Sequence, residues 1–280
     1  MNSYNDTAYD IADDAITLDV KDNILNARNV MMKYNISRII ITDNKMLAGI
    51  VTEKDIVRFL YSSKLNRRPQ EIMLDEVMGE KIPITVDEKT RLISCAKMML
   101  SKNISSLIIT QKNSADIRIL TKTDIVEYYS RFYKRVNKVK DYMTTPVLSI
   151  SQDELVSEAM RLLFENKVSR LVVIKNDKAI GIISRRDLIP LSSLMNSWIE
   201  KYQKNQVGFD TVIGNIKGII IVKDVMRSYL ITVSSNDDLS DAAKIMTRNR
   251  ISGLPVVDKN SNLKGIVTKT DVVRAFSNLS

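Results

Sequence analysis

Histidine is absent from all 280 residues, and cysteine occurs once. The absence of histidine excludes Ser-His-Asp and Cys-His nucleophile systems, histidine general bases and nearly all catalytic zinc sites. A single cysteine excludes an internal disulfide. Cys95 occupies a helix position that holds alanine in three related segments described below, which favours a small packing residue over a reactive thiol. Any enzymatic interpretation must use other chemistry.

Long apolar runs are also missing. The longest, such as residues 219–222, are far shorter than the ~20 residues that span a bilayer. The first residues lack the basic and apolar regions of a signal peptide, so the sequence predicts a cytoplasmic protein. A composition of 44% hydrophobic and 27% charged residues is typical of a globular protein, and the length has room for two domains.

Negative charge is in the minority, because the net charge is +9, and this favours anionic partners. Three basic clusters contain Lys64, Arg67 and Arg68, then Arg131, Lys134, Arg135, Lys138 and Lys140, and finally Arg185 and Arg186. Solvated, lysine-rich surfaces explain the first two clusters. A basic helix that follows nucleic-acid phosphates explains them as well, although no recognition motif or interleaved aromatics accompany them. Both interpretations stay open.

The chain does contain one motif in four versions. Each version is a short apolar strand that runs directly into a helix, with a hydroxyl residue at the junction and an aspartate three residues later. The four junctions are Thr52 with Asp55, Thr121 with Asp124, Ser184 with Asp187, and Thr268 with Asp271. The chain is therefore organised around a repeated unit.

The repeat extends well beyond this junction. Counted from Thr17, Thr85, Ser149 and Thr232, apolar or small residues recur at steps 7, 10 and 14, which mark one face of a helix. A serine follows at step 20 in every copy, just before a β-branched run that predicts a second strand. Register kept over about forty residues identifies a genuine repeat. We predict a mixed α/β (α+β) fold of four β-α-β-β-α units.

Odd and even copies differ. The aspartate falls at step 38 in odd copies and 39 in even ones, odd copies carry Ser-Arg at step 20, and only even copies read Thr-Lys-Thr-Asp. The unit is therefore predicted to be a pair, duplicated once, because one repeat of about 60 residues buries little surface alone.

We expect a first pair at 1–130 (repeats at about 12–60 and 76–130), a linker helix at 131–138, and a second pair at 139–280 (repeats at about 139–190 and 223–280). A helical insert at 191–222 carries an apolar stripe that suits either core packing or an interface.

The junction residues allow two interpretations. A hydroxyl before a helix with a carboxylate three residues later is a capping arrangement. The same helix start presents free amides that suit phosphate, and an aspartate suits two ribose hydroxyls. Arg38 and Arg170 follow the step-20 serine, and an arginine fork fits phosphate, although a plain surface arginine is the alternative. Capping and ligand binding can share one site.

The sequence resembles the cystathionine-β-synthase (CBS) domain family over nearly its whole length, most closely at Ile251–Asp258 followed by Gly265–Asp271. The resemblance implies pairs of repeats with two clefts for an adenosine compound, such as AMP, ADP, ATP or S-adenosylmethionine. It also implies that the aspartate holds ribose, that the hydroxyl residue lies beside ribose or phosphate, and that adenine rests near Thr145, Pro146 and Val147. The ligand-binding residues expected on this basis are Arg38, Thr52, Asp55, Thr121, Asp124, Thr145, Pro146, Val147, Arg170, Ser184, Arg186, Asp187, Thr268 and Asp271.

Two departures from the family pattern stand out. Arg118 replaces the glycine of the other copies, so its side chain is expected to fill the cleft or distort the turn. Val-Val-Asp after the second strand is complete only in the fourth copy. The resemblance therefore carries more weight in the second pair.

Together these features predict a non-catalytic regulatory protein that requires no cofactor or metal. It would bind an adenosine-containing molecule and pass a shape change to a protein partner or to its own oligomer. Homodimerisation and internal stacking of the two pairs are both open. A nucleic-acid-associated protein is the rival interpretation, and an unrecognised enzyme would need a domain for which the chain has no spare length.

Overall fold

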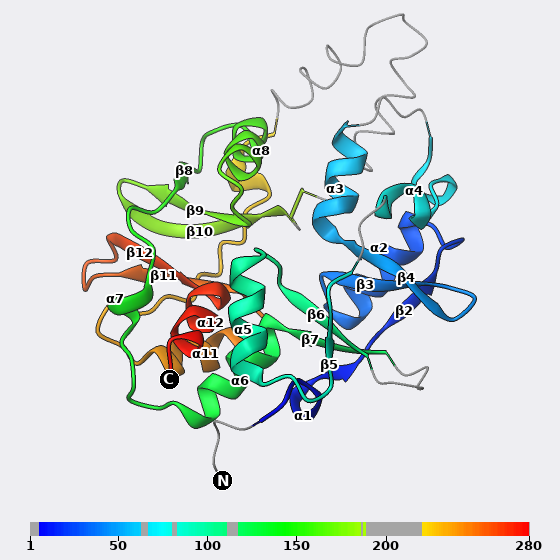
Figure 1. Cartoon of the computed structure of the whole chain (residues 1–280). Helices are drawn as coiled ribbons and strands as arrows, with labels where there is room; N and C mark the ends of the chain where they lie inside the picture. Colours follow the sequence, from blue (N-terminus) through cyan, green and yellow to red (C-terminus); the bar gives the residue numbers. More distant parts are fainter. Residues whose placement is uncertain are drawn as a thin grey trace, which may run out of the picture.

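Figure 1 shows the chain as a computed structural model, which describes residues 6–62, 67–79, 83–110, 117–185, 187–188 and 220–279. Nearly all of the predicted insert lies outside these residues, and so does Arg186. Within the described ranges, no helix is long and apolar enough to cross a membrane.

The first two repeats have the predicted order of elements. Repeat 1 contains β2 (Thr17–Asp19), α2 (Ile24–Tyr34), β3 (Arg38–Asp43), β4 (Met46–Thr52) and α3 (Glu53–Ser62). Repeat 2 contains β5 (Thr85–Asp87), α5 (Leu92–Ser101), β6 (Ser106–Thr110), β7 (Arg118–Thr121) and α6 (Lys122–Phe132). In both, the first strand pairs in parallel with the second, and the third returns antiparallel. The helix between the parallel strands supplies the crossover that such a pairing needs.

The second pair follows the same plan. Repeat 3 contains β8 (Ser149–Ser151), α8 (Val156–Glu165), β9 (Arg170–Lys175) and β10 (Lys178–Ser184). Repeat 4 contains α11 (Leu239–Arg248), β11 (Gly253–Val257), β12 (Leu263–Thr268) and α12 (Lys269–Ser277). The first strand of repeat 4 is reduced to a parallel bridge between Val233 and Val256.

The repeated helical face forms the core of each repeat. Every residue at steps 7, 10 and 14 is buried: Ile24, Ala27 and Met31 on α2, Leu92, Cys95 and Met99 on α5, Val156, Ala159 and Leu163 on α8, and Leu239, Ala242 and Met246 on α11. Cys95 has no exposed surface, and burial raises the pKa of its thiol to about 11. Its expected role in packing fits this environment.

Each repeat is preceded by a short lead segment that packs on the other repeat of its pair. The lead segments contain α1 (Ala8–Ile11) with β1 (Asp13–Asp14), η1 (Pro69–Glu71) with α4 (Leu74–Met78), α7 (Val139–Tyr142), and η2 (Val222–Asp224). Backbone bridges join Thr7 to Arg91, Met73 to Asn23, Lys138 to Asp238, and Ile221 to Leu155. The strand β1 also extends the sheet of repeat 2, whose order is β1-β7-β6-β5. The two repeats of each pair are therefore joined by a reciprocal exchange of chain.

Three lead segments end in a methionine that touches a glycine in the third strand of the other repeat. The contacts are Met78 with Gly49, Met143 with Gly265, and Met226 with Gly181. A β-carbon at Gly265 or Gly181 would lie 2.7 or 2.8 Å from the methionine sulfur. A side chain at either glycine would therefore displace the methionine.

Arg118 takes the glycine position in repeat 2, and Ala12 takes the matching methionine position. The Arg118 guanidinium lies 4.2 Å from the centre of the Tyr9 ring, donates to the Tyr9 carbonyl at 3.1 Å and approaches the Asp14 carboxylate at 3.4 Å. The strands β6 and β7 pair without a shift of register. The large and small residues have thus changed sides, and the arginine side chain packs on Tyr9 of the lead segment.

The two pairs stack through their even repeats. Helices α5 and α6 lie beside α11 and α12 in the middle of the molecule (Figure 1), and one hydrophobic core runs through both repeats. The rings of Tyr128 and Tyr133 meet the edge of Phe276 at centroid distances of 5.8 and 5.6 Å. Internal stacking, one of the two arrangements left open by the sequence, is present.

The segment between the pairs is not the helix that the sequence predicted. Helix α6 ends at Phe132, Arg135 has a left-handed backbone (φ 61°), and residues 134–135 form a turn. The Arg135 amide donates to Asp238 Oδ2 at 2.6 Å, and the Leu239 amide donates to the Asn137 carbonyl at 2.9 Å. These bonds to the start of α11 turn the chain away from α6, which explains the failed prediction.

Candidate functional site

All four repeated junctions form helix caps. The amide of the hydroxyl residue donates to Oδ2 of the aspartate, at 3.1 Å for Thr52 and at 2.6, 2.8 and 2.8 Å in the following copies. The hydroxyl groups of Thr52, Ser184 and Thr268 donate to the same oxygen at 2.6, 2.6 and 2.7 Å. Capping is confirmed, and it occupies one oxygen of each carboxylate.

The second oxygen, Oδ1, differs between copies. At Asp187 it accepts from Arg227 Nε at 2.9 Å, and at Asp271 it accepts from Arg274 Nη1 at 3.0 Å. At Asp124, the part of the chain that the structure describes provides no donor to this oxygen. Asp124 therefore keeps an acceptor available after capping.

Asp124 also has an unusual protonation equilibrium. Burial raises the pKa of its carboxyl from 3.8 to about 6, Thr121 opposes the rise through hydrogen bonds, and the charges of Asp13 and Lys269 act in opposite directions. A desolvated carboxylate with an oxygen that lacks a donor is a common mark of a binding site. A ligand that donates hydrogen bonds would stabilise its charged form.

The arginine of repeat 3 reaches the junction of repeat 4. A β-carbon at Gly253 would lie 3.3 Å from both Arg170 Cδ and Thr268 Cγ2, so both side chains lie beside Gly253 at the start of β11. Along the chain, Arg170 and Asp187 belong to the same repeat. In the structure, Arg170 packs on repeat 4, and Asp187 is bound by Arg227. Packing between repeats 3 and 4 thus brings together residues that are distant in the chain.

The first pair makes the equivalent combination. Removal from water lowers the pKa of the Arg38 guanidinium, and the charges of Glu53 and Asp124 oppose this shift. Arg38 of repeat 1 is therefore close enough to Asp124 of repeat 2 to interact with it. In both pairs the odd-repeat arginine is therefore near the even-repeat junction, with Asp124 in the first pair and Thr268 in the second.

Crossing lysines tie the two even junctions together. Lys122 Nζ donates to Thr270 Oγ1 at 3.0 Å, and Lys269 Nζ donates to Thr123 Oγ1 at 2.8 Å. This reciprocal contact explains why only the even copies read Thr-Lys-Thr-Asp. The sequence showed that Thr-Lys-Thr-Asp occurs only in the even copies, but it did not predict that these lysines join the two even junctions.

Positive charge is concentrated around this crossing. Removal from water lowers the pKa of Lys122, the positive charges of Arg38 and Arg274 add to the shift, and Asp271 opposes it. We call Arg38, Lys122, Lys269 and Arg274 the central basic cluster. Cations held together beside two helix starts are suited to a phosphate group.

Thr145, Pro146 and Val147 lie on the lead segment of repeat 3, beside repeat 4. Thr144 exchanges two backbone hydrogen bonds with Ile266, at 2.8 and 3.1 Å, and Thr268 follows two residues later. Thr145 and Pro146 are exposed, and Val147 is half-buried. The three residues therefore flank the junction that Arg170 reaches.

Comparison with protein families identifies the repeats. The model of the CBS domain family matches residues 8–62, 71–131, 139–193 and 222–278. The chain belongs to the CBS domain family. Its four CBS repeats form the two pairs described above, as the resemblance in the sequence predicted.

The relatives of this CBS protein differ in how much of the chain they cover. MJ1225 of Methanocaldococcus jannaschii is 27% identical over 258 residues, 88% of each chain. Its crystal structure, described as that of a candidate archaeal homologue of g-AMPK, has a TM-score of 0.78 at 26% identity and covers 95% of this chain and 98% of its own. CBSX2 of Arabidopsis thaliana, solved in complex with AMP, is 31% identical, covers 49% of this chain and 94% of its own, and has a TM-score of 0.39.

One match is to an enzyme. Inosine-5'-monophosphate dehydrogenase of Korarchaeum cryptofilum is 30% identical over 197 residues, which are 68% of this chain but 36% of the dehydrogenase. Because only about a third of the enzyme is matched, its activity does not transfer to the CBS repeats.

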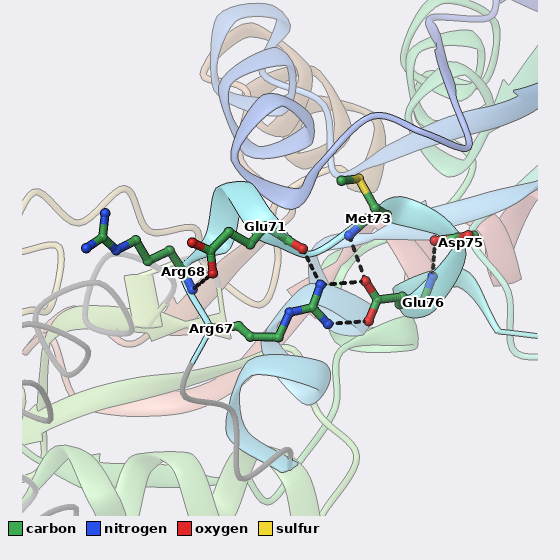
Figure 2. A network of polar contacts seen from close by, with 6 residues as sticks. All are labelled: Arg67, Arg68, Glu71, Met73, Asp75 and Glu76. Atoms are coloured by element: carbon green, nitrogen blue, oxygen red, sulfur yellow. Dashed lines mark hydrogen bonds and ion pairs between the residues drawn. The ribbon is translucent and has the colours of Figure 1, made fainter. Parts of the chain in front are cut away.

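Part of the basic surface around CBS repeats 1 and 2 is neutralised within the chain. Figure 2 shows Arg67 held by Glu76, with Nη1 2.7 Å from Oε2 and Nη2 3.0 Å from Oε1, and close to the Glu71 carbonyl. Arg131 is paired with Glu127. These contacts reduce the charge that two of the basic clusters present to nucleic acid. In the described ranges, no group of three or more acidic or cysteine side chains could hold a metal ion.

Proposed function

We propose that this CBS protein is a non-catalytic sensor whose adenine-nucleotide sites are shared between the two repeats of a pair. The observation that carries the proposal is the position of Arg170 of repeat 3, which lies against Gly253 beside Thr268 of repeat 4. In the first pair, Arg38 of repeat 1 and Asp124 of repeat 2 are close enough for their charges to interact. An arginine suits the phosphate, and an aspartate suits the ribose hydroxyls. The two groups together match both polar parts of an adenosine nucleotide.

The central basic cluster favours an anionic ligand. AMP, ADP and ATP carry phosphate charge that the cluster would attract, whereas the sulfonium and ammonium groups of S-adenosylmethionine would be repelled. In the first pair, Asp124 offers an oxygen that the cap leaves available. At Asp271, ligand hydroxyls would have to replace Arg274, which is bound from the next turn of the same helix. We therefore expect nucleotides to bind more tightly than S-adenosylmethionine.

Binding would act on the stack of the two pairs. A phosphate that attracts Lys122 or Lys269 competes with the threonine that each lysine holds across the junction. A ligand shifts such an arrangement only as far as its affinities for the two states differ. A protein partner, or the oligomer, would respond to the resulting change of shape.

A thermal-shift screen with AMP, ADP, ATP, S-adenosylmethionine, CTP and a random DNA duplex tests the proposal. At a hundredfold excess over Kd, one ligand adds about 2.7 kcal/mol, or roughly 5–10 °C for a chain of this size. Shifts with adenine nucleotides alone support the proposal. Equal shifts with CTP and ATP would indicate polyphosphate binding on a basic surface, and salt-dependent binding of the duplex alone would favour nucleic acid. Nucleotide turnover in the same sample would show an enzyme.

Matched arginine variants test the site itself. Arg170→Gln should weaken AMP by about tenfold or more and leave adenosine nearly unchanged, because only AMP carries the phosphate. Arg161→Gln is the control: Arg161 pairs with Glu158 and Glu165 on an exposed face of α8. Calorimetric titration of both ligands should distinguish the two variants, and equal effects would contradict the assignment of Arg170.

A further inference from the structure

Three of the lead segments place a residue of different charge at the same position beside a junction. Thr144 exchanges backbone hydrogen bonds with Ile266 at 2.8 and 3.1 Å, and Arg227 does so with Ile182 at 2.9 and 3.1 Å. Asp13 pairs with Ile119 in the same position. In all three cases the paired isoleucine lies two residues before the hydroxyl of a junction. Asp13, Thr144 and Arg227 therefore occupy equivalent places beside Asp124, Asp271 and Asp187.

At Asp187 this position carries a positive charge that occupies the carboxylate. Arg227 Nε lies 2.9 Å from Oδ1, while the amide and hydroxyl of Ser184 occupy Oδ2. The Asp187 side chain is 9% exposed and the Asp271 side chain 3%, so the two sites differ in the origin of the arginine and not in burial. Both oxygens that could accept ribose hydroxyls are already engaged.

The arginine at Asp271 differs in its attachment. Arg274 comes from the same helix, three residues on, and such pairs within one exposed helix face are weak. Arg227 comes from the other repeat, and its backbone is fixed on both sides of the peptide by the bonds to Ile182. A ligand can therefore displace Arg274 more easily than Arg227.

We propose that Arg227 keeps the Asp187 site closed to adenosine ligands, so that the second pair binds its ligand at the Asp271 site. This inference rests on the proposed function, and it states which of the two sites in the second pair holds the ligand. The equivalent position holds Arg227, Thr144 or Asp13. This one difference would give the three repeated sites different affinities for an adenosine ligand.

A reciprocal exchange of side chains tests this inference with AMP as the probe. Arg227→Thr introduces the residue that the Asp271 site carries, and should add one binding event in calorimetric titration or tighten the weakest event by about tenfold. The added binding should disappear in the double variant Arg227→Thr, Asp187→Asn. Thr144→Arg should remove one event from the titration of the 280-residue chain. Melting temperatures without ligand show whether each variant is folded.

Each outcome decides the inference. Unchanged binding in Arg227→Thr overturns it and leaves the proposed function in place, because the wild-type protein would still bind AMP. An added event that persists without the Asp187 charge also overturns it, since the new site would lie elsewhere. If neither wild type nor Arg227→Thr binds AMP, the inference and the proposed function both fail. If Arg227→Thr alone binds, the closure of this site is supported directly.

Discussion

Asp124→Asn should stabilise the unliganded protein at neutral pH while it weakens AMP binding. Asparagine resembles the protonated aspartate in shape and charge, and its carbonyl oxygen can still accept the Thr121 amide. The pKa of Asp124 lies at about 6 instead of 3.8, and about 2 units correspond to roughly 3 kcal/mol against the charged form. Because the side chain is only partly buried, we expect a gain of about 1–2 kcal/mol at pH 7.

The pH dependence has a definite sign. The folded-state pKa of Asp124 is raised, so its charged form opposes folding above pH 6, and this penalty fades as the pH falls from about 6 to about 4. Urea unfolding should therefore show a larger stability difference between Asp124→Asn and wild type at pH 7 than at pH 5. AMP binding to the wild type should weaken below pH 6, and the variant should bind about tenfold more weakly at pH 7.

Asp141→Asn is a matched control for capping. The Lys138 amide donates to Asp141 Oδ2 at 2.9 Å, and Asp141 is exposed. Its loss should cost up to about 1 kcal/mol and leave AMP affinity unchanged. If Asp124→Asn destabilises the protein in the same way and does not affect AMP, then Asp124 is only a cap and the reasoning is refuted.

Three further variants test packing and charge. Cys95→Ala should cost about 1 kcal/mol in urea unfolding and leave AMP titration unchanged, because Cys95 is a fully buried packing residue; lost affinity with an intact fold would give the thiol a binding role. Lys122→Met with Lys269→Met removes both crossing charges and should weaken AMP far more than adenosine in calorimetry, whereas equal losses would make the lysines structural. Arg118→Gly should lower stability by about 1–2 kcal/mol by leaving space beside Ala12, and the addition of Ala12→Met should recover most of it; a double variant less stable than the single one would contradict the exchange of volume.

Local spacing was sufficient to predict the helices and their buried faces. Ala27, Ala159 and Ala242 are buried because a helical face repeats every three to four residues, and this holds wherever the helix packs. The linker at 131–138 was predicted wrongly for the opposite reason. Its aromatic pattern continues that of α6, but bonds to Asp238 and Leu239 in a distant repeat end the helix.

The composition of the site could be predicted only in part. The sequence indicated the arginines and the aspartates, but spacing along the chain cannot show that Arg170 packs beside Thr268. That proximity arises only when two repeats pack together. The alternation of Ser-Arg with Thr-Lys-Thr-Asp contained the signal, because complementary groups on alternate copies indicate one combined site. Arg227 could not be recognised, since nothing in its surroundings marks it as a partner of Asp187.

The hydrophobic core shared by repeats 2 and 4 makes each pair one half of a larger folding unit. A cut between the pairs would expose an apolar face that includes Tyr128 on one side or Phe276 on the other. Lys122 bonds to Thr270 and Lys269 bonds to the equivalent Thr123, so the two faces contact each other reciprocally. A surface that fits its own duplicate can fit a second copy of itself. The chain therefore has the architecture of a dimer whose subunits have been fused, and we expect either half, produced alone, to restore the missing face by self-association.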